Sequence, residues 1–285
     1  MKFLRFGSVG QEKPAIIDQN GDMRDLSNVI GDITPEFLTN SEVINKIRAT
    51  NLLQLQRVPE DARIGAPISG IGKLVGVGLN YSDHAAESNL PIPNEPILFM
   101  KATSAISGPY DDVELPPHAD EVDWEVELGI VVGKRSKCVP LDQAMDHVFG
   151  YMIVNDVSER CWQARRQGQW TKGKSHDTFA PLGPWLVTRD EVPDPQKLGM
   201  TLDVSGVRRQ NGSTSTMIFG VGFLIHYISQ FMTLDVGDII TTGTPPGVGL
   251  GMKPPQYLKD GDVMKLAIDG LGFQRQTAVG VKRHV

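Results

Sequence analysis

Short apolar runs separated by turn residues dominate the chain after residue 73, a pattern typical of a β-rich protein. These runs are rich in β-branched residues and end at Gly, Pro or Asp, as strands do. The pattern predicts strands at 73–77, 97–100, 122–132, 150–154, 185–188, 200–204, 239–242, 263–268 and 274–281. Helices are predicted at 156–167 and at 215–232. The second helix is apolar almost all round, so we expect it to be buried.

Strands and helices do not alternate regularly, which argues against a doubly wound or barrel α/β fold. The predicted class is therefore mixed α+β, mostly β. Residues 1–70 form a separate pattern, with short strands at 3–6 and 15–17 and a helix opened by Thr34-Pro35-Glu36. Asn20-Gly21 predicts a type I′ hairpin turn. The Pro-, Gly- and Ser-containing stretch 59–72 is typical of a linker, so we predict a small N-terminal α+β domain (1–70) and a main domain (71–285).

The composition excludes several functional classes but does not identify the function. The 285 residues carry 28 basic and 34 acidic side chains, a net charge of −6, which gives no electrostatic footprint for nucleic acid or anionic lipid. No apolar run reaches the ~18 residues that a membrane helix needs, and no signal peptide is evident. Cys138 and Cys161 are the only cysteines. They are too few for a zinc cluster and fit a reduced cytoplasm.

One nucleotide-binding pattern has to be set aside. Residues 168–175, GQWTKGKS, match the P-loop pattern G-x-x-x-x-G-K-[ST]. A P-loop needs a preceding strand and a following helix whose N–H groups hold phosphate. Here Pro181 and Pro184 follow closely and forbid that helix. We therefore predict that this segment does not bind nucleotide.

The strongest candidate chemistry lies in the alternating segment 122–128. Strand side chains alternate between faces, so Asp123, Glu125 and Glu127 would share one face, with neighbours ~6.5–7 Å apart. Alone, this pattern favours a solvent-facing strand, because antiparallel sheets often have one wet face. However, the strand continues into 129–133 without alternation, as a buried strand would. A carboxylate pair that enters a buried strand favours a site for a hard cation.

Other candidates are weak individually. Asp156 follows a predicted strand and suits either a third oxygen ligand or a helix N-cap. Arg160 and Gln163 are three apart and would share a helix face, exposed or directed at a substrate carboxylate. His84 and Glu87 are also three apart, so the carboxylate could orient the imidazole as a base, or both could lie on an unimportant surface turn. The Gly-rich turn 241–247 could present N–H groups to an anion or be an ordinary turn.

Taken in order, these pieces resemble the fumarylacetoacetate hydrolase family, over roughly residues 73–281. The resemblance rests on six ordered segments: Asn80-Tyr81-x-x-His84-x-x-Glu87, Glu125-x-Glu127-Leu128-x-x-Val131-x-Gly133-Lys134, Asn155-Asp156-x-x-x-Arg160-x-x-Gln163, Lys174-Ser175, Arg209-Gln210-x-Gly212-x-Thr214-Ser215-x-Met217-Ile218-Phe219, and Gly243-Thr244-Pro245-x-Gly247-Val248-Gly249. Each motif alone is weak, but six in the same order are specific.

The resemblance implies a fold, a site and a set of partners. The fold is a β-roll of mixed sheets, usually a homodimer, with the His–Glu helix acting as a mobile lid. The implied ligands of Mg²⁺ or Mn²⁺ (Ca²⁺ in crystals) are Glu125, Glu127 and Asp156, with Asp123 outside the set. The implied catalytic residues are His84, Glu87 and Lys174. The implied substrate-binding residues are Arg160, Gln163, Gly243 and Thr244.

The chemistry implied is hydrolysis of the C3–C4 bond of a 2,4-diketo acid to pyruvate and a carboxylic acid, with His84 activating water. A 2,4-diketo-3-deoxy-rhamnonate or -fuconate is one such substrate. Lyases share this scaffold, including oxaloacetate decarboxylases, isomerase/decarboxylases and proteins named ureidoglycolate lyase. Decarboxylation of a 2-oxo-dicarboxylate needs the same enolate stabilisation but no attacking water, so the lyases remain alternatives. A non-enzymatic binder of small molecules or an assembly protein is a further alternative.

Overall fold

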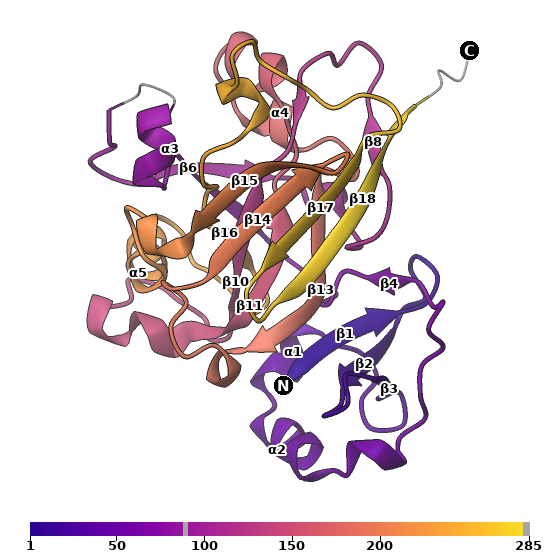
Figure 1. Cartoon of the computed structure of the whole chain (residues 1–285). Helices are drawn as coiled ribbons and strands as arrows, with labels where there is room; N and C mark the ends of the chain where they lie inside the picture. Colours follow the sequence, from indigo (N-terminus) through magenta and orange to yellow (C-terminus); the bar gives the residue numbers. More distant parts are fainter. Residues whose placement is uncertain (88–90, 282–285) are drawn as a thin grey trace.

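A long mixed sheet runs through the molecule and joins its N-terminal part to the rest (Figure 1). The structure is a computed structural model that describes residues 1–87 and 91–281. The sheet has 11 strands. Its main path, in spatial order, is β3 (Met23–Asp25), β2 (Lys13–Ile17), β1 (Lys2–Phe6), β13 (Ala180–Thr188), β11 (Val148–Asn155), β10 (Val126–Val132), β16 (Ile239–Thr241), β5 (Leu74–Gly78) and β6 (Ile97–Lys101). Two short strands, β4 (Ile64–Gly65) and β7 (Ile106–Ser107), pair with β1 and β13.

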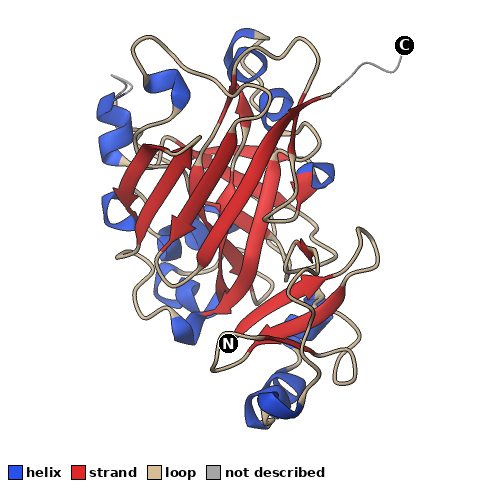
Figure 2. Ribbon diagram, turned by 45° about the vertical axis from the view of Figure 1, so that its right-hand side comes forward, coloured by secondary structure: helices blue, strands red, loops and turns tan. Residues whose placement is uncertain are grey.

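A second sheet of five strands packs against the centre of the first, as Figure 2 shows. Its order is β15 (Val207–Ser213), β14 (Gly199–Val204), β17 (Val263–Ile268), β18 (Gly272–Gly280) and β8 (Val113–Leu115). Leu202 and Leu266 of this sheet share one hydrophobic core with Leu128 and Ile130 of β10. Every residue of β10 is therefore buried, which explains why its sequence does not alternate. The predicted mixed, mostly β class is confirmed.

Helices are short and lie around the sheets. They are α1 (Pro35–Thr39), α2 (Ser41–Ala49), α3 (Ser82–Glu87), α4 (Thr171–Lys174) and α5 (Val221–Phe231). Within the described ranges, none is long and apolar enough to cross a bilayer.

The two helices predicted from the pattern were partly wrong. Residues 156–167 are not one helix, because β12 (Ser158–Glu159) pairs with β9 (Val122–Asp123) and leaves only a π-helical turn at Cys161–Arg165. The second helix begins at Val221 rather than 215, after the extended N-cap Gly220. It is also buried on one side only, since the Phe231 side chain is exposed.

The N-terminal part differs from the prediction in its turn and in its linker. The hairpin between β2 and β3 is present, but only Gly21 of the Asn20-Gly21 pair has a positive φ, so the turn is not type I′. Instead, the Asp18 carboxylate accepts hydrogen bonds from the amides of Asn20 and Asp22 and shapes the turn. The expected linker 59–72 contains β4, which pairs with β1.

Most predicted strands lie within two or three residues of the observed ones, although β13 begins five residues earlier and 122–132 is split into β9 and β10. The edge strand β15 was missed, because its sequence Val207–Ser213 is polar apart from one valine. An edge strand needs no apolar partner on its open side, so its sequence carries little strand signal.

Candidate metal centre and its cavity

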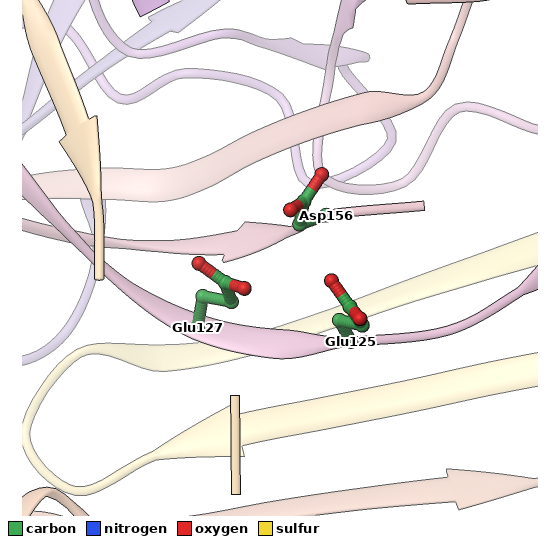
Figure 3. A group of neighbouring side chains, drawn as sticks. All are labelled: Glu125, Glu127 and Asp156. Atoms are coloured by element: carbon green, nitrogen blue, oxygen red, sulfur yellow. The ribbon is translucent and has the colours of Figure 1, made fainter. Parts of the chain in front are cut away.

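Three buried carboxylates meet where β10 begins and β11 ends. Glu125, Glu127 and Asp156 are each at most 5% exposed, and one oxygen from each lies within 4.8 Å of the others. Figure 3 shows the three side chains turned toward one another. They arise from adjacent antiparallel strands, in which Val126 pairs with Asn155, and the Asp156 amide donates to the Glu125 carbonyl at 2.9 Å. The register of these two strands therefore sets the cluster.

Three cationic side chains surround the carboxylates. Lys174 Nζ lies 2.7 Å from both Glu125 Oε2 and Asp156 Oδ2. The Arg160 guanidinium donates to Glu125 Oε1 at 2.7 Å. Lys101 Nζ donates to Asp156 Oδ1 at 2.5 Å and to the Val157 carbonyl at 3.1 Å. All three cations are 5% exposed or less, so these are ion pairs in a poorly solvated setting.

The carboxylates differ in how well they are neutralised. Burial raises the pKa of Glu125, but Arg160 and Lys174 outweigh it and hold the pKa far below its usual range. Glu127 has the opposite balance, because burial and then the charges of Asp156 and Glu125 raise its pKa well above the usual range. Its oxygen Oε2 accepts hydrogen bonds from the Thr241 hydroxyl and the Gly243 amide, neither of which carries a charge. The cluster therefore lacks positive charge beside Glu127.

A divalent cation fits this arrangement. Mg²⁺ and Mn²⁺ prefer oxygen ligands from carboxylates, and three such oxygens converge here, from Glu127 on β10 and from Glu125 and Asp156 next to the ends of β10 and β11. A cation at this point would also relieve the repulsion that raises the pKa of Glu127.

Two residues of this network were not predicted as site residues. Asp123 accepts hydrogen bonds from Arg160 Nε at 2.8 Å and from the amides of Gly249 and Leu250. It thereby fixes the guanidinium that holds Glu125. Lys101 ends an apolar strand, and a lysine there usually reaches solvent. The signal available for Asp123 was its place in the alternating segment, whereas the sequence offers none for Lys101.

The His84–Glu87 pair lies on α3, as predicted. His84 Nδ1 is 3.2 Å from Glu87 Oε2, and the Gly247 amide donates to both Glu87 oxygens at 3.1 Å. Burial raises the pKa of Glu87, but the bonds from His84 and Gly247 outweigh it and hold the pKa below its usual range. The Trp124 indole donates to the Gly247 carbonyl at 3.1 Å and so orients this peptide. Part of the predicted lid, residues 88–90, lies outside the described residues.

One cavity of about 270 Å³ brings the predicted residues together. All of them except Glu87 line it: His84, Glu125, Glu127, Asp156, Arg160, Gln163, Lys174, Gly243 and Thr244. Glu87 does not line the cavity itself but contacts His84, which does. Residues from five separate segments thus surround one space, as a small-molecule site requires.

Several predicted substrate-binding groups already have protein partners. Arg160 donates to Gln163 Oε1 at 3.0 Å, so these two residues hold one another. The Thr244 hydroxyl donates to the Val126 carbonyl at 2.9 Å and accepts from Gln210. The anions held by the 241–247 turn are the protein's own carboxylates, since the Gly243 amide binds Glu127 and the Gly247 amide binds Glu87.

The P-loop-like segment has no phosphate-binding geometry. Lys174 ends the four-residue helix α4, and its amine is bound to Glu125 and Asp156. The residues after Lys174 lead through a turn into β13 rather than into a helix.

Comparison with known proteins identifies the family. The profile of the fumarylacetoacetate (FAA) hydrolase C-terminal family matches residues 73–279. The chain belongs to the fumarylacetoacetate hydrolase family. The relative named 2,4-didehydro-3-deoxy-L-rhamnonate hydrolase, from Sphingomonas sp. (strain SKA58), is 55% identical over 277 residues, covering 97% of this chain and 95% of the relative.

Solved structures of the family extend the likeness to the whole fold. The fumarylacetoacetate hydrolase from Exiguobacterium antarcticum has a TM-score of 0.85 and 35% identity, over 99% of this chain and 100% of that one. Maleylpyruvate hydrolase from Sphingobium sp. SYK-6, in complex with manganese(II) and pyruvate, has a TM-score of 0.83 and 29% identity over the same shares. The predicted family and β-roll fold are therefore confirmed, and the protein is an enzyme that acts on keto acids. Its acidic cluster and the manganese-bound neighbour together support a divalent metal.

Proposed function

We propose that this enzyme hydrolyses the C3–C4 bond of a 2,4-diketo acid. The observation that carries the proposal is that His84 lines the same cavity as Glu125, Glu127 and Asp156. The reaction is R–CO–CH₂–CO–COO⁻ plus water, giving R–COO⁻, H⁺ and pyruvate. Both O–H bonds of water and the C3–C4 bond break, while C4 gains the oxygen, C3 gains one proton and the other proton is released.

The chain's own residues supply binding and proton transfer. His84, oriented by Glu87, accepts a proton from water as that water adds to C4. Lys174 places positive charge near the oxygen on C2, where negative charge develops as C3 departs. Arg160 and Gln163 hold the wall of the cavity next to the acidic cluster through their mutual bond.

Glu125, Glu127 and Asp156 would hold Mg²⁺ or Mn²⁺. When bound, such a cation supplies a Lewis acid beside the carboxylate and the 2-oxo group of the substrate. Glu127→Gln should weaken metal binding while leaving the ion pairs of Glu125 intact, because Glu127 contacts only neutral donors.

The relative from Sphingomonas supports one particular substrate. 2,4-Didehydro-3-deoxy-L-rhamnonate is a 2,4-diketo acid, and the two chains align over almost their full lengths. We propose it as the substrate; the corresponding diketo acid derived from L-fuconate is the same compound, because C5 is the only stereocentre left. We also propose a cytoplasmic location, which the free thiols of Cys138 and Cys161 support. The family resemblance further implies a homodimer, which is part of this proposal.

Release of pyruvate, or of glyoxylate in the case of ureidoglycolate, provides the test. The purified enzyme with Mg²⁺ or Mn²⁺ would be assayed on acetylpyruvate, on 2,4-didehydro-3-deoxy-L-rhamnonate, on oxaloacetate and on ureidoglycolate. We expect pyruvate from the two diketo acids, loss of activity with EDTA, and recovery on adding metal. Activity on oxaloacetate or ureidoglycolate alone would show that the enzyme is a lyase rather than a hydrolase. If no compound is turned over, the protein would be a non-enzymatic binder of small molecules.

A further inference from the structure

An aromatic wall lies along one side of the cavity, and two glycines of β5 make room for it. Gly76 and Gly78 are two apart and so present the same face of the strand. A Cβ atom on Gly76 would lie 2.1 Å from the Phe99 ring, and one on Gly78 would lie 2.4 Å from the Trp170 ring. Both rings therefore rest directly on the backbone of β5.

The wall extends from the reaction centre toward the outside. The Phe99 ring lies 4.8 Å from Lys174 Nζ, and the Trp170 ring lies 5.5 Å from the Phe99 ring. Ile97 lines the cavity on the same strand as Phe99 and is 38% exposed, so it marks the outer end of the wall. Phe99 thus adjoins the group that would hold the pyruvyl part of the substrate, and Trp170 and Ile97 lie beyond it.

The remaining part of the cavity is also apolar. Val77, Leu79, Ala164, Val248 and Leu250 complete its apolar lining. Among the described residues that line the cavity, the only side chains with a permanent positive charge are Arg160 and Lys174. Both are already paired with buried carboxylates, Arg160 with Asp123 and Glu125 and Lys174 with Glu125 and Asp156. A second carboxylate on the substrate would therefore find no free cation here.

We propose that the enzyme selects 2,4-diketo acids whose acyl substituent is short and uncharged, alkyl or hydroxyalkyl, and rejects those that end in a second carboxylate. This inference rests on the proposed function and specifies its substrate class. An ionised group that loses water without gaining a partner is strongly disfavoured. The methyl and hydroxyl groups of the rhamnonate substrate meet the requirement, whereas the maleyl group does not.

Two diketo acids of the same shape test the proposal. In 7-methyl-2,4-dioxooctanoate the substituent is CH₂CH₂CH(CH₃)₂, and in 2,4-dioxoheptanedioate it is CH₂CH₂COO⁻. We expect kcat/KM for pyruvate release to be about 100-fold higher for the compound with the uncharged substituent, as for a buried polar group left unpaired. Equal kcat/KM values for the two compounds would overturn the proposed selectivity but would not affect the proposed hydrolase function. If neither compound, nor acetylpyruvate, releases pyruvate, the proposed function falls and this inference falls with it.

A variant of the wall adds a second test. Ile97→Arg places a cation at the exposed outer end, where it should not disturb folding, and Ile97→Met is the matched neutral control. The arginine should shift the ratio of the two kcat/KM values toward the dicarboxylate by about 10-fold or more, the scale of a charge-assisted hydrogen bond. The methionine should leave the ratio unchanged. A ratio that Ile97→Arg does not move would show that the substituent lies elsewhere and would overturn the proposal.

Discussion

At the scale of single residues, the chemistry depends on which charges are paired and which are left over. Glu125 and Glu127 could be predicted from alternation along one strand, and Asp156 from its place after the next. The role of Lys101 could not be predicted, because nothing in the apolar run 97–100 shows that the lysine after it points inward to a carboxylate. Only the folded structure reveals that partner, Asp156, which lies 55 residues further along the chain. Residue types are thus readable from the sequence, whereas long-range pairs are not.

The first prediction concerns His84, whose imidazole lines the cavity and contacts Glu87. His84→Ala should lower the rate of diketo-acid hydrolysis by ~10²–10⁴-fold, as expected for loss of a general base. Glu87→Ala should lower it less, because the carboxylate only orients the ring. Metal binding, measured by calorimetry with Mn²⁺, should be unchanged in both variants. Hydrolysis at the wild-type rate by His84→Ala would exclude the water-activating role.

Lys174 allows a second prediction, directed at the P-loop-like pattern. Its amine is held by Glu125 and Asp156, so no phosphate is expected to bind there. Calorimetry with ATP and Mg²⁺ should show no binding to the wild-type chain, while Lys174→Ala should lower hydrolysis by ~10²-fold or more, in the range of a lost charge stabiliser. Tight ATP binding that Lys174→Ala abolishes would contradict both roles.

At the scale of elements, the strands were easier to predict than the helices. Buried strands carry continuous apolar runs, and these are local signals. Residues 156–167 lack such a signal, and their backbone is captured by a partner far away, since Ser158 pairs with Asp123 and the Arg160 amide donates to the Glu121 carbonyl. The predicted helix placed Arg160 and Gln163 on one face, and their side chains are indeed hydrogen-bonded to each other. The predicted backbone conformation, however, was wrong.

The turn that holds Glu87 gives an element-scale prediction. Gly247 has φ +105°, and a Cβ there would lie 1.9 Å from the Arg209 carbonyl oxygen. Gly247→Ala should displace its amide from Glu87 and lower kcat about as much as Glu87→Ala does, at a cost of ~1–3 kcal/mol in stability.

Gly261→Ala is the matched control, because Gly261 has φ +88° but nothing within 4 Å of a new Cβ. It should carry the backbone strain without the loss of kcat. Similar kcat losses in both variants would show that strain alone, rather than the contact with Glu87, explains the effect of Gly247→Ala.

At the scale of the whole molecule, the first 70 residues share both sheet and core with the rest. β1 pairs with β13, so Phe3 lies opposite Leu186, and Phe3, Ile16 and Ile33 belong to the same hydrophobic core as the central strands. The local pattern of the N-terminal part could be predicted from the sequence. The pairing of this part with the main sheet could not be predicted, because a contact between residues 3 and 186 has no signal in the local sequence of either strand.

This pairing predicts the effect of removing the N-terminal part. A chain limited to residues 71–285 would expose the edge of β13 and the apolar side chains that β1 covers, so we expect aggregation or a lower melting temperature. Phe3→Ala in the full chain is the milder control, expected to cost ~3–5 kcal/mol as a buried phenylalanine does. A shortened chain that is soluble and melts cooperatively at the wild-type temperature would instead establish residues 71–285 as an independent domain.

The close contact between Gly78 and Trp170 has a consequence for how this family diverges. The cavity wall can be reshaped from either partner, because a larger residue at 78 requires a smaller one at 170, and a smaller ring leaves space that a side chain on β5 can fill. The two positions lie far apart in the sequence, yet neither can change freely while the other stays the same. Among homologues they should therefore vary together, and each covarying pair would mark a change of substrate preference.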